Sequence, residues 1–92
     1  MAVVVVAEVN GGTQEQYDAV SAKAMEGDQL PDGCQAHIAG PTDSGWRVIT
    51  VWDSEEQFHA FRNERLIPAL GAGGFEAAPE IKVDQIHRLI TA

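Results

Sequence analysis

Apolar residues recur along this chain with two periods, one typical of strands and one typical of helices. The clearest strand covers residues 46–52, where successive side chains would point to opposite faces. One face would carry Trp46, Val48, Thr50 and Trp52, and the other Arg47, Ile49 and Val51. Alternation with a period of two among β-branched and aromatic residues predicts a half-buried strand. Similar apolar blocks predict further strands over residues 2–9, 34–39 and 81–90.

The starts of two helices are marked by the same short motif. Thr13 stands three residues before Gln16, and Ser54 stands three residues before Gln57. In such a capping box, side chain and backbone satisfy each other's free N–H groups at the first turn of a helix. We therefore predict helices that begin after Thr13 and after Ser54.

Glycine and proline indicate where these helices end. The first helix would carry an apolar stripe at spacings of three and four residues, formed by Tyr17, Val20, Ser21 and Ala24. Gly27 is a suitable C-terminal stop for it. Pro68 is expected to limit the second helix, because proline lacks the N–H that an inner helical position donates. A loose glycine- and alanine-rich loop is expected over residues 71–79.

The predicted elements follow the order βαββαβ, the ferredoxin-like arrangement of the α+β class, in a single domain over residues 1–92. In this topology the second and last strands form the sheet edges, and both helices cover one face. The strands carry many apolar residues on both faces, so the other face also needs a cover. A second copy of the chain is the simplest cover, and we expect a homodimer with facing sheets.

The charge balance narrows the classes of partner. The chain has 92 residues, with 14 acidic and 6 basic side chains and a formal net charge of -8. Because the basic residues are scattered, neither nucleic acid nor an anionic membrane is an expected partner. The apolar residues 3–7 are too few to cross a bilayer and lack the basic flank of a signal peptide. The single cysteine, Cys34, fits a reducing compartment, and we expect a cytoplasmic protein.

Several segments together resemble one known family. They are residues 51–58 (Val-Trp-Asp-Ser-Glu-Glu-Gln-Phe), Phe61, residues 66–70 (Leu-Ile-Pro-Ala-Leu) and residues 35–41 (Gln-Ala-His-Ile-Ala-Gly-Pro). Their order is similar to that in the dimeric α/β-barrel proteins of the antibiotic biosynthesis monooxygenase type. The resemblance implies ferredoxin-like subunits that pair into an α/β barrel. Activities in that family include cofactor-independent oxygenation of aromatic polyketides, haem degradation, and isomerase or cyclase chemistry, and fold alone does not select among them.

His37 and Trp52 are the candidate catalytic residues. His37 would share a strand face with Gln35, opposite Cys34, and a histidine that faces a cavity can act as a general base near neutral pH. The alternative is a histidine that only hydrogen-bonds a neighbour. Trp52 lies where a strand ends beside a helix start, a common place for a pocket. Its ring can form one wall of a pocket for a flat substrate, and its indole N–H can orient a carbonyl oxygen. Packing in the core is its alternative role.

A wider set of residues is expected to contact substrate. It comprises Tyr17, Trp46, Thr50, Phe58, Phe61 and His87. Simple packing is the alternative role for the helical aromatic residues. His87 would lie at the opposite sheet edge from His37, so the two would meet only across a dimer. Glu8 is a candidate carboxylate near His37 or Trp52, with a solvated strand end as the alternative.

No cofactor or metal is expected. The histidines at positions 37, 59 and 87 lack the short ligand spacings of zinc sites. Haem-degrading relatives hold iron through a histidine late in the second helix, whereas residues 61–65 here read Phe-Arg-Asn-Glu-Arg and His59 comes too early. The Gly-Ala-Gly-Gly run at 71–74 neither follows a strand nor ends in Gly-Lys-Ser/Thr, which excludes a phosphate-binding loop.

The resemblance, taken with His37 and the lack of a cofactor motif, implies a cofactor-independent monooxygenase that acts on an electron-rich, polyketide-like aromatic molecule. His37 would remove an acidic substrate proton, Trp52 would orient the ring, and the resulting carbanion would react with O₂. Two alternatives remain open at this point. One is a non-catalytic dimer that binds a small hydrophobic molecule or assists an enzyme. The other is a polyketide cyclase or isomerase that uses the same pocket and base without consuming oxygen.

Overall fold

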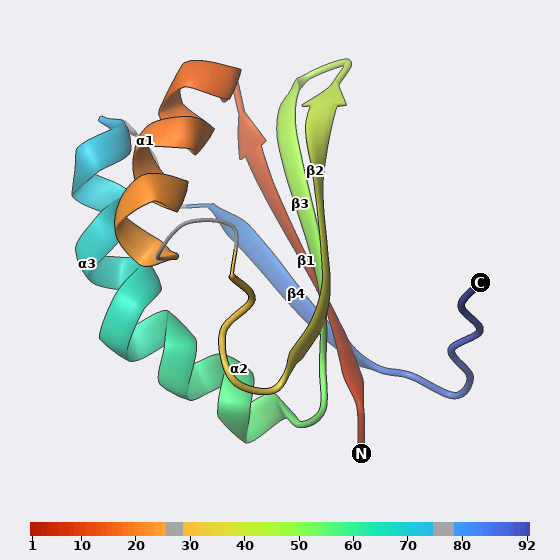
Figure 1. Cartoon of the computed structure of the whole chain (residues 1–92). Helices are drawn as coiled ribbons and strands as arrows, with labels where there is room; N and C mark the ends of the chain where they lie inside the picture. Colours follow the sequence, from red (N-terminus) through yellow and green to blue (C-terminus); the bar gives the residue numbers. More distant parts are fainter. Residues whose placement is uncertain (26–28, 75–78) are drawn as a thin grey trace.

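Four antiparallel strands form one sheet in the computed structural model, which describes residues 1–25, 29–74 and 79–92. The strands are β1 (Val3–Asn10), β2 (Cys34–Thr42), β3 (Gly45–Trp52) and β4 (Glu80–Gln85). Their order across the sheet is β2-β3-β1-β4, so β2 and β4 are the edges (Figure 1). This arrangement confirms the predicted ferredoxin-like α+β fold.

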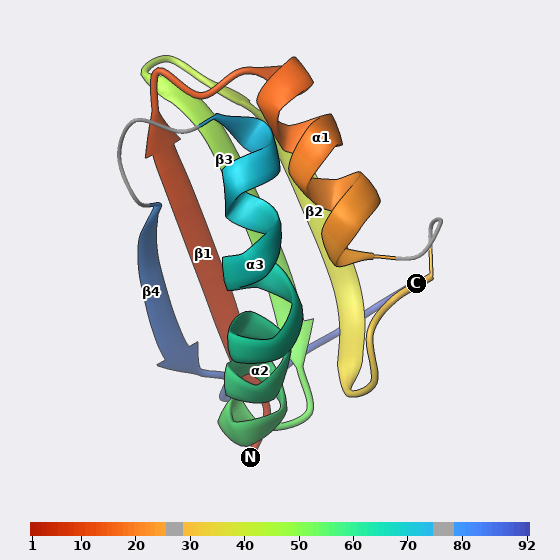
Figure 2. The ribbon, with the colours of Figure 1, turned by 90° about the vertical axis from the view of Figure 1, so that its left-hand side faces the viewer.

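The described helical segments lie on one face of this sheet. α1 (Gln14–Ala24) faces a continuous helical run made of α2 (Glu55–Phe61), a π-helical turn (Arg62–Leu66), α3 (Ile67–Leu70) and a 3₁₀ turn (Gly71–Gly73). Figure 2 shows α1 and α3 side by side in front of the strands, and Figure 1 shows the other sheet face without a helix. The described residues therefore form two layers, and one sheet face is left uncovered by them.

The two predicted capping boxes differ in how completely they form. At α1 both halves are present: Thr13 Oγ1 accepts from the Gln16 N–H at 3.2 Å, and Gln16 Oε1 accepts from the Thr13 N–H at 3.1 Å. At α2, Ser54 Oγ accepts from the Gln57 N–H at 3.2 Å, but Gln57 Oε1 accepts from the Ser54 hydroxyl and not from its backbone. The second box is therefore only half formed. Gly27, the predicted end of the first helix, lies outside the described residues.

The prediction that Pro68 limits the second helix is wrong. α3 includes Pro68 in its first turn, and the helical run continues to Gly73. A π-helical turn precedes the proline, in which the Ile67 N–H bonds to the carbonyl of Arg62, five residues earlier. In a regular α-helix the proline ring clashes with the carbonyl four residues before it, and the wider turn relieves that contact. Of the predicted loop over residues 71–79, residues 71–73 are therefore part of the helical run.

Two strand boundaries also differ from the predictions. β2 runs to Thr42 instead of ending at residue 39, because an edge strand tolerates a proline such as Pro41. β4 ends at Gln85 instead of at residue 90. Gln85 pairs with Val3, the first residue of β1, and a last hydrogen bond of 2.9 Å joins the Ile86 N–H to the chain just before β1. Beyond that point β1 offers no backbone to pair with, so residues 87–90 lie off the sheet.

The core lies between the helices and the sheet. One cluster of buried residues contains Val3, Val5, Trp52 and Phe58, and a second contains Val20, Ala24 and Ala69. Trp52 is the largest fully buried side chain, with 1% of its surface exposed. The odd-numbered residues of β1 face this core, so alternation directs the even-numbered ones to the uncovered face.

The uncovered sheet face carries an apolar patch. The pairing register places Val6 beside Ile49 and Ile49 beside Ile38. Val4 lies beside Val51 in the next row. Ile38 is 61% exposed, which is high for a β-branched residue within a strand. Antiparallel sheets usually present polar residues on a face that meets water, so this face has the composition of one that is covered.

Candidate functional site

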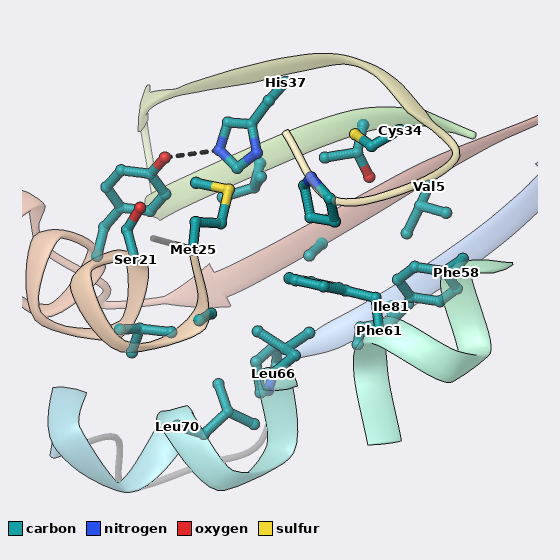
Figure 3. Close-up of a pocket in the computed structure, with 18 of the residues that line it drawn as sticks. Val5, Ser21, Met25, Cys34, His37, Phe58, Phe61, Leu66, Leu70 and Ile81 are labelled. Atoms are coloured by element: carbon teal, nitrogen blue, oxygen red, sulfur yellow. Dashed lines mark hydrogen bonds between the residues drawn. The ribbon is translucent and has the colours of Figure 1, made fainter. Parts of the chain in front are cut away.

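An apolar cavity of about 110 Å³ lies between the helices and the sheet. Inward-facing residues of β1, β2 and β3 form one side, and α1 with the α2–α3 run forms the other. Figure 3 shows His37 and Cys34 on the strand side of this cavity, and Leu66 and Leu70 on the helix side. A mostly apolar hollow with a few polar groups is the usual form of a small-molecule site. We call this space the inner cavity.

One hydrogen bond in the wall of the inner cavity joins Tyr17 to His37. The Tyr17 hydroxyl lies 2.6 Å from His37 Nε2 (Figure 3). The capping box fixes the start of α1, which places Tyr17 on the stripe that faces the sheet, and β2 places His37 opposite it. The ring of Tyr17 also packs on Trp46, with centroids 5.4 Å apart and an angle of 33° between the rings. Both partners therefore lie on regular elements, which hold a functional geometry more rigidly than loops do.

His37 is neutral at pH 7. Burial lowers the pKa of His37 below its ordinary value of 6.5, because desolvation disfavours the charged imidazolium. With the ring proton on Nδ1, Nε2 carries a lone pair and the Tyr17 hydroxyl donates to it. An imidazole lone pair in a cavity wall is a general base, and the adjacent hydroxyl can donate to an oxygen that gains negative charge.

The predicted faces of β2 are wrong at its first residues. Cys34 pairs with Trp52 and Ala36 pairs with Val51, so Gln35 is an extra residue opposite β3. This β-bulge interrupts the alternation of side chains, and Cys34 lines the inner cavity on the same side as His37. Gln35 is exposed and donates from Nε2 to Asp53 Oδ1. His37 therefore shares its face with Cys34 and not with Gln35.

Cys34 is an apolar part of the wall and not a nucleophile. Burial raises the pKa of the Cys34 thiol above its ordinary value of 9.0. The thiol also donates a weak hydrogen bond of 3.4 Å to the carbonyl oxygen of Ala36. A thiol that stays protonated near neutral pH has little nucleophilic character.

Trp52 walls the inner cavity, but its indole N–H is already engaged. The nitrogen Nε1 donates to Thr50 Oγ1 at 2.9 Å. The ring packs edge-on against Phe58, with ring centroids 5.7 Å apart. It also packs against Phe61 in a tilted arrangement, with ring centroids 5.3 Å apart. The predicted use of the N–H to orient a carbonyl oxygen does not fit this geometry. The flat ring is the part of Trp52 that can face a ligand.

The structure brings the predicted site residues to one cavity, with the exceptions of His87 and the candidate Glu8. The lining residues among them are Tyr17, His37, Trp46, Thr50, Trp52, Phe58 and Phe61. His87 follows the end of β4 and is exposed, away from this cavity. Glu8 is also exposed, and it lies between Arg47 and Glu80 on the uncovered sheet face. Neither the His87 side chain nor the Glu8 carboxylate therefore reaches His37 within one subunit.

The inner cavity also contains residues that the sequence patterns did not assign to a site. They include Ser21, Met25, Pro31, Cys34, Leu66 and Leu70. The predicted apolar stripe of α1 already contained Ser21. Had the second helix been predicted to continue past Pro68, Leu66 and Leu70 would have fallen on the same helix face, because they are four residues apart. Cys34 was assigned to the opposite strand face because strict alternation does not allow for the bulge at Gln35. Met25 and Pro31 lie outside any periodic segment, so no sequence signal could have placed them.

The described part of the chain offers no candidate metal centre. Across residues 1–25, 29–74 and 79–92, no group of three or more His, Cys, Asp or Glu side chains could hold a metal ion. His59 lies on the surface, where its Nε2 is 3.0 Å from Glu55 Oε2. In the same ranges, every helix is too short or too polar to cross a bilayer.

Comparison with known proteins places this fold among solved structures. No protein-family model matches the sequence, and no curated protein matches it significantly. A Chloroflexus aurantiacus J-10-fl protein described as an antibiotic biosynthesis monooxygenase superposes with a TM-score of 0.70 at 21% identity, covering 99% of this chain and 98% of that one. SnoaB, a cofactor-independent oxygenase from Streptomyces nogalater, gives 0.66 at 13% identity, covering 99% and 97%. The ActVA-Orf6 monooxygenase of Streptomyces coelicolor, solved with nanaomycin D, gives 0.60 at 21%, covering 99% and 91%.

These similarities establish the class of structure. The chain has the α+β fold of the antibiotic biosynthesis monooxygenase-like proteins over nearly its whole length. The resemblance predicted from residues 51–58 is therefore confirmed at the level of the fold. Proteins with one fold catalyse many reactions, so at these identities the activities of the neighbours remain their own.

Proposed function

We propose that this protein is a cofactor-independent monooxygenase that oxidises an electron-rich, polyketide-like aromatic molecule. The observation that carries the proposal is the Tyr17–His37 pair, which sets a general base and a hydrogen-bond donor 2.6 Å apart in an apolar cavity. The fold supports it, because SnoaB, which shares the fold, is named a cofactor-independent oxygenase. The rings of Trp52 and Phe61 provide flat walls that suit an aromatic ligand.

The proposed reaction takes its electrons from the substrate and needs no flavin or metal. As an anthrone-like substrate binds, the Tyr17 hydroxyl turns from His37 Nε2 to the substrate oxygen, which frees the Nε2 lone pair. The methylene between two aromatic rings then loses a proton to His37 Nε2, and the imidazolium later returns that proton to the peroxide. The hydrogen bond from Tyr17 stabilises the substrate oxygen, which gains negative charge as the proton leaves. The carbanion adds O₂ to give a hydroperoxide, which loses water and leaves a ketone. The balance is R₂CH₂ + O₂ → R₂C=O + H₂O, with one oxygen atom in the product and the other in water.

Oxygen uptake tests this proposal directly. The purified protein is incubated with an anthrone under ¹⁸O₂, and oxygen consumption and product mass are followed together. We expect protein-dependent uptake and one ¹⁸O atom in each quinone product. Conversion without oxygen consumption would indicate a cyclase or isomerase instead. Retention of the unchanged anthrone would indicate a binding protein.

We also propose that the protein is a homodimer that pairs through the uncovered sheet face. The apolar patch there includes Val4, Val6, Ile38 and Ile49. The C-terminal residues leave the sheet on the same side (Figure 1) and add two exposed apolar side chains, Leu89 and Ile90. A chain of this size buries a limited share of its own surface, and a two-fold partner would remove the patch from water.

A cytoplasmic location completes the proposal. Cys34 is a free, half-buried thiol, which fits a reducing compartment. The net charge of -8 disfavours partners that are themselves anionic, such as nucleic acids and anionic membranes. A small hydrophobic or aromatic molecule is the ligand that the inner cavity suits.

A further inference from the structure

A second hollow adjoins the inner cavity beside the end of α1. Its volume is about 400 Å³, and polar and apolar side chains line it together. The polar members are Gln29, Asp32, Gln57, Glu64 and Arg65. We call this space the outer cleft.

Four residues line both spaces: Ala24, Met25, Pro31 and Phe61. The inner cavity and the outer cleft are therefore neighbours that share these side chains in their walls. Figure 3 shows Met25, which directly follows α1, and Phe61 of α2 on opposite sides of the cavity. Methionine is unbranched and adapts its shape easily. Phe61 ends α2 directly before the π-helical turn, a distortion that often occurs at functional sites.

The sizes of the two spaces decide what each can hold. A cavity of about 150 Å³ accommodates benzene, and sites for drug-sized molecules measure about 300–1,000 Å³. The inner cavity, at about 110 Å³, therefore holds at most a single ring. The outer cleft is large enough for more, but its polar side chains do not suit a bare hydrocarbon surface. A polycyclic ligand that reaches Tyr17 and His37 must extend into the outer cleft.

The polar groups of the outer cleft favour one kind of substituent. Asp32 and Glu64 contribute two carboxylates, and Gln29 and Gln57 contribute amides. Arg65 takes part in an interaction of its own. Carboxylates accept hydrogen bonds from hydroxyl groups and repel a ligand carboxylate. The net charge of -8 acts in the same direction on an anionic ligand.

We propose that the inner cavity and the outer cleft form one two-part binding site for a neutral, hydroxylated, fused-ring aromatic. The reacting ring lies in the inner cavity against Tyr17 and His37, and the hydroxylated remainder lies in the outer cleft. The ligand passes between Met25, Pro31 and Phe61, whose side chains determine how thick a ring system can enter. This inference rests on the proposed function for the identity of the ring in the inner cavity.

The test uses two ligands of different length and two matched variants. Phenol is the single-ring probe of the inner cavity, where Met25 must adjust to admit it, and 1,8-dihydroxyanthraquinone needs both spaces. Ala60→Phe adds bulk at an exposed helical residue that lines only the outer cleft. Ile67→Phe is the control, because Ile67 is 48% exposed and lines neither space. Binding is followed by NMR through the indole N–H signals of Trp46 and Trp52, because both residues line the inner cavity. This measurement does not depend on turnover.

We expect Ala60→Phe to weaken binding of the anthraquinone by at least about tenfold while phenol binding stays within about twofold. Ile67→Phe should change neither. An anthraquinone affinity that is unchanged in Ala60→Phe, or an anthraquinone that fails to bind where phenol binds, overturns the two-part site and leaves the proposed function standing. If neither ligand moves the indole signals of the unsubstituted protein, the proposed function and the two-part site both fail.

A carboxylated ligand tests the chemical class. The 3-carboxylate of 1,8-dihydroxyanthraquinone has the same rings and one negative charge. We expect it to bind at least about fivefold more weakly than the neutral compound, and Glu64→Gln to reduce that difference. Equal affinities for the two compounds would refute the preference for a neutral ligand.

Discussion

At the scale of single residues, the site depends on a donor from the helix layer and an acceptor from the sheet. Among the described residues, the 2.6 Å contact between Tyr17 and His37 is the hydrogen bond that joins two side chains of the inner-cavity wall across these layers. Burial keeps His37 neutral, and in the tautomer with its proton on Nδ1 the ring accepts the Tyr17 hydrogen bond at Nε2. In the proposed mechanism the two residues make separable contributions, His37 as the base and Tyr17 as the donor.

The His37→Gln variant tests the base. Glutamine can still accept the Tyr17 hydrogen bond but cannot take up a proton, so the rate of anthrone oxidation should fall about 10²- to 10⁴-fold. The measurement is the initial rate of oxygen uptake, with the melting temperature as a check on folding. Tyr17→Phe is the complementary variant. Its rate of anthrone oxidation should fall about 10²-fold, because it loses only the hydrogen-bond donor. Full activity in His37→Gln would remove His37 from the mechanism.

Stability should depend on pH in a direction set by the lowered pKa of His37. Between that lowered pKa and the ordinary value of 6.5, the unfolded chain binds a proton at this position that the folded chain does not. The free energy of unfolding therefore falls as the pH drops below about 6.5. Urea unfolding at about pH 7.5 and about pH 5.5 should show a smaller difference for His37→Gln than for the unsubstituted protein. Identical differences in the two proteins would mean that His37 is not buried as described.

At the scale of secondary-structure elements, α1 positions the donor, and its first turn is fixed by the Thr13 capping box. Thr13 satisfies one free N–H of that turn and also lines the inner cavity. Thr13→Ala should lower the free energy of unfolding by about 1 kcal/mol, and Thr13→Ser should be nearly neutral because serine keeps the acceptor. Urea denaturation measures both, with an unchanged slope showing that the unfolding transition is the same. Equal stabilities for the alanine and serine variants would show that the cap contributes nothing.

Local patterns predicted the starts of the elements better than their internal irregularities. The capping residues Thr13 and Ser54 placed both helix starts correctly. The π-helical turn before Pro68 and the bulge at Gln35 were not predictable, because each depends on how the element packs on its neighbours. Each changes which side chains face the inner cavity. The irregularities are thus where sequence periodicity stops describing the site.

At the scale of the whole molecule, the uncovered sheet face should control assembly. Ile38→Glu places a carboxylate within the apolar patch, and in a two-fold dimer it would meet its own copy or lie unpaired in the interface. We expect this variant to elute with the 9.9 kDa mass of one chain, and the unsubstituted protein to elute with about twice that mass. Size-exclusion chromatography with light scattering makes the measurement.

The control for assembly is Gln14→Glu. It adds the same charge at the exposed start of α1, in the helix layer and away from the sheet face. This variant should remain dimeric. A monomeric unsubstituted protein, or an Ile38→Glu variant that stays dimeric, would show that this sheet face is not the interface.

The sequence by itself determined the order of the elements, the faces of β3 and the apolar stripe of α1. These features follow from periodicity and capping, which act between residues close together in the chain. Only the tertiary structure decided that the Tyr17 hydroxyl meets His37 and that the Trp52 N–H is taken by Thr50. Those contacts depend on how α1 lies across the sheet and on side-chain packing within the core. Hydrogen-bond partners are selected at the ångström scale, and residue spacing along a chain does not specify positions that finely.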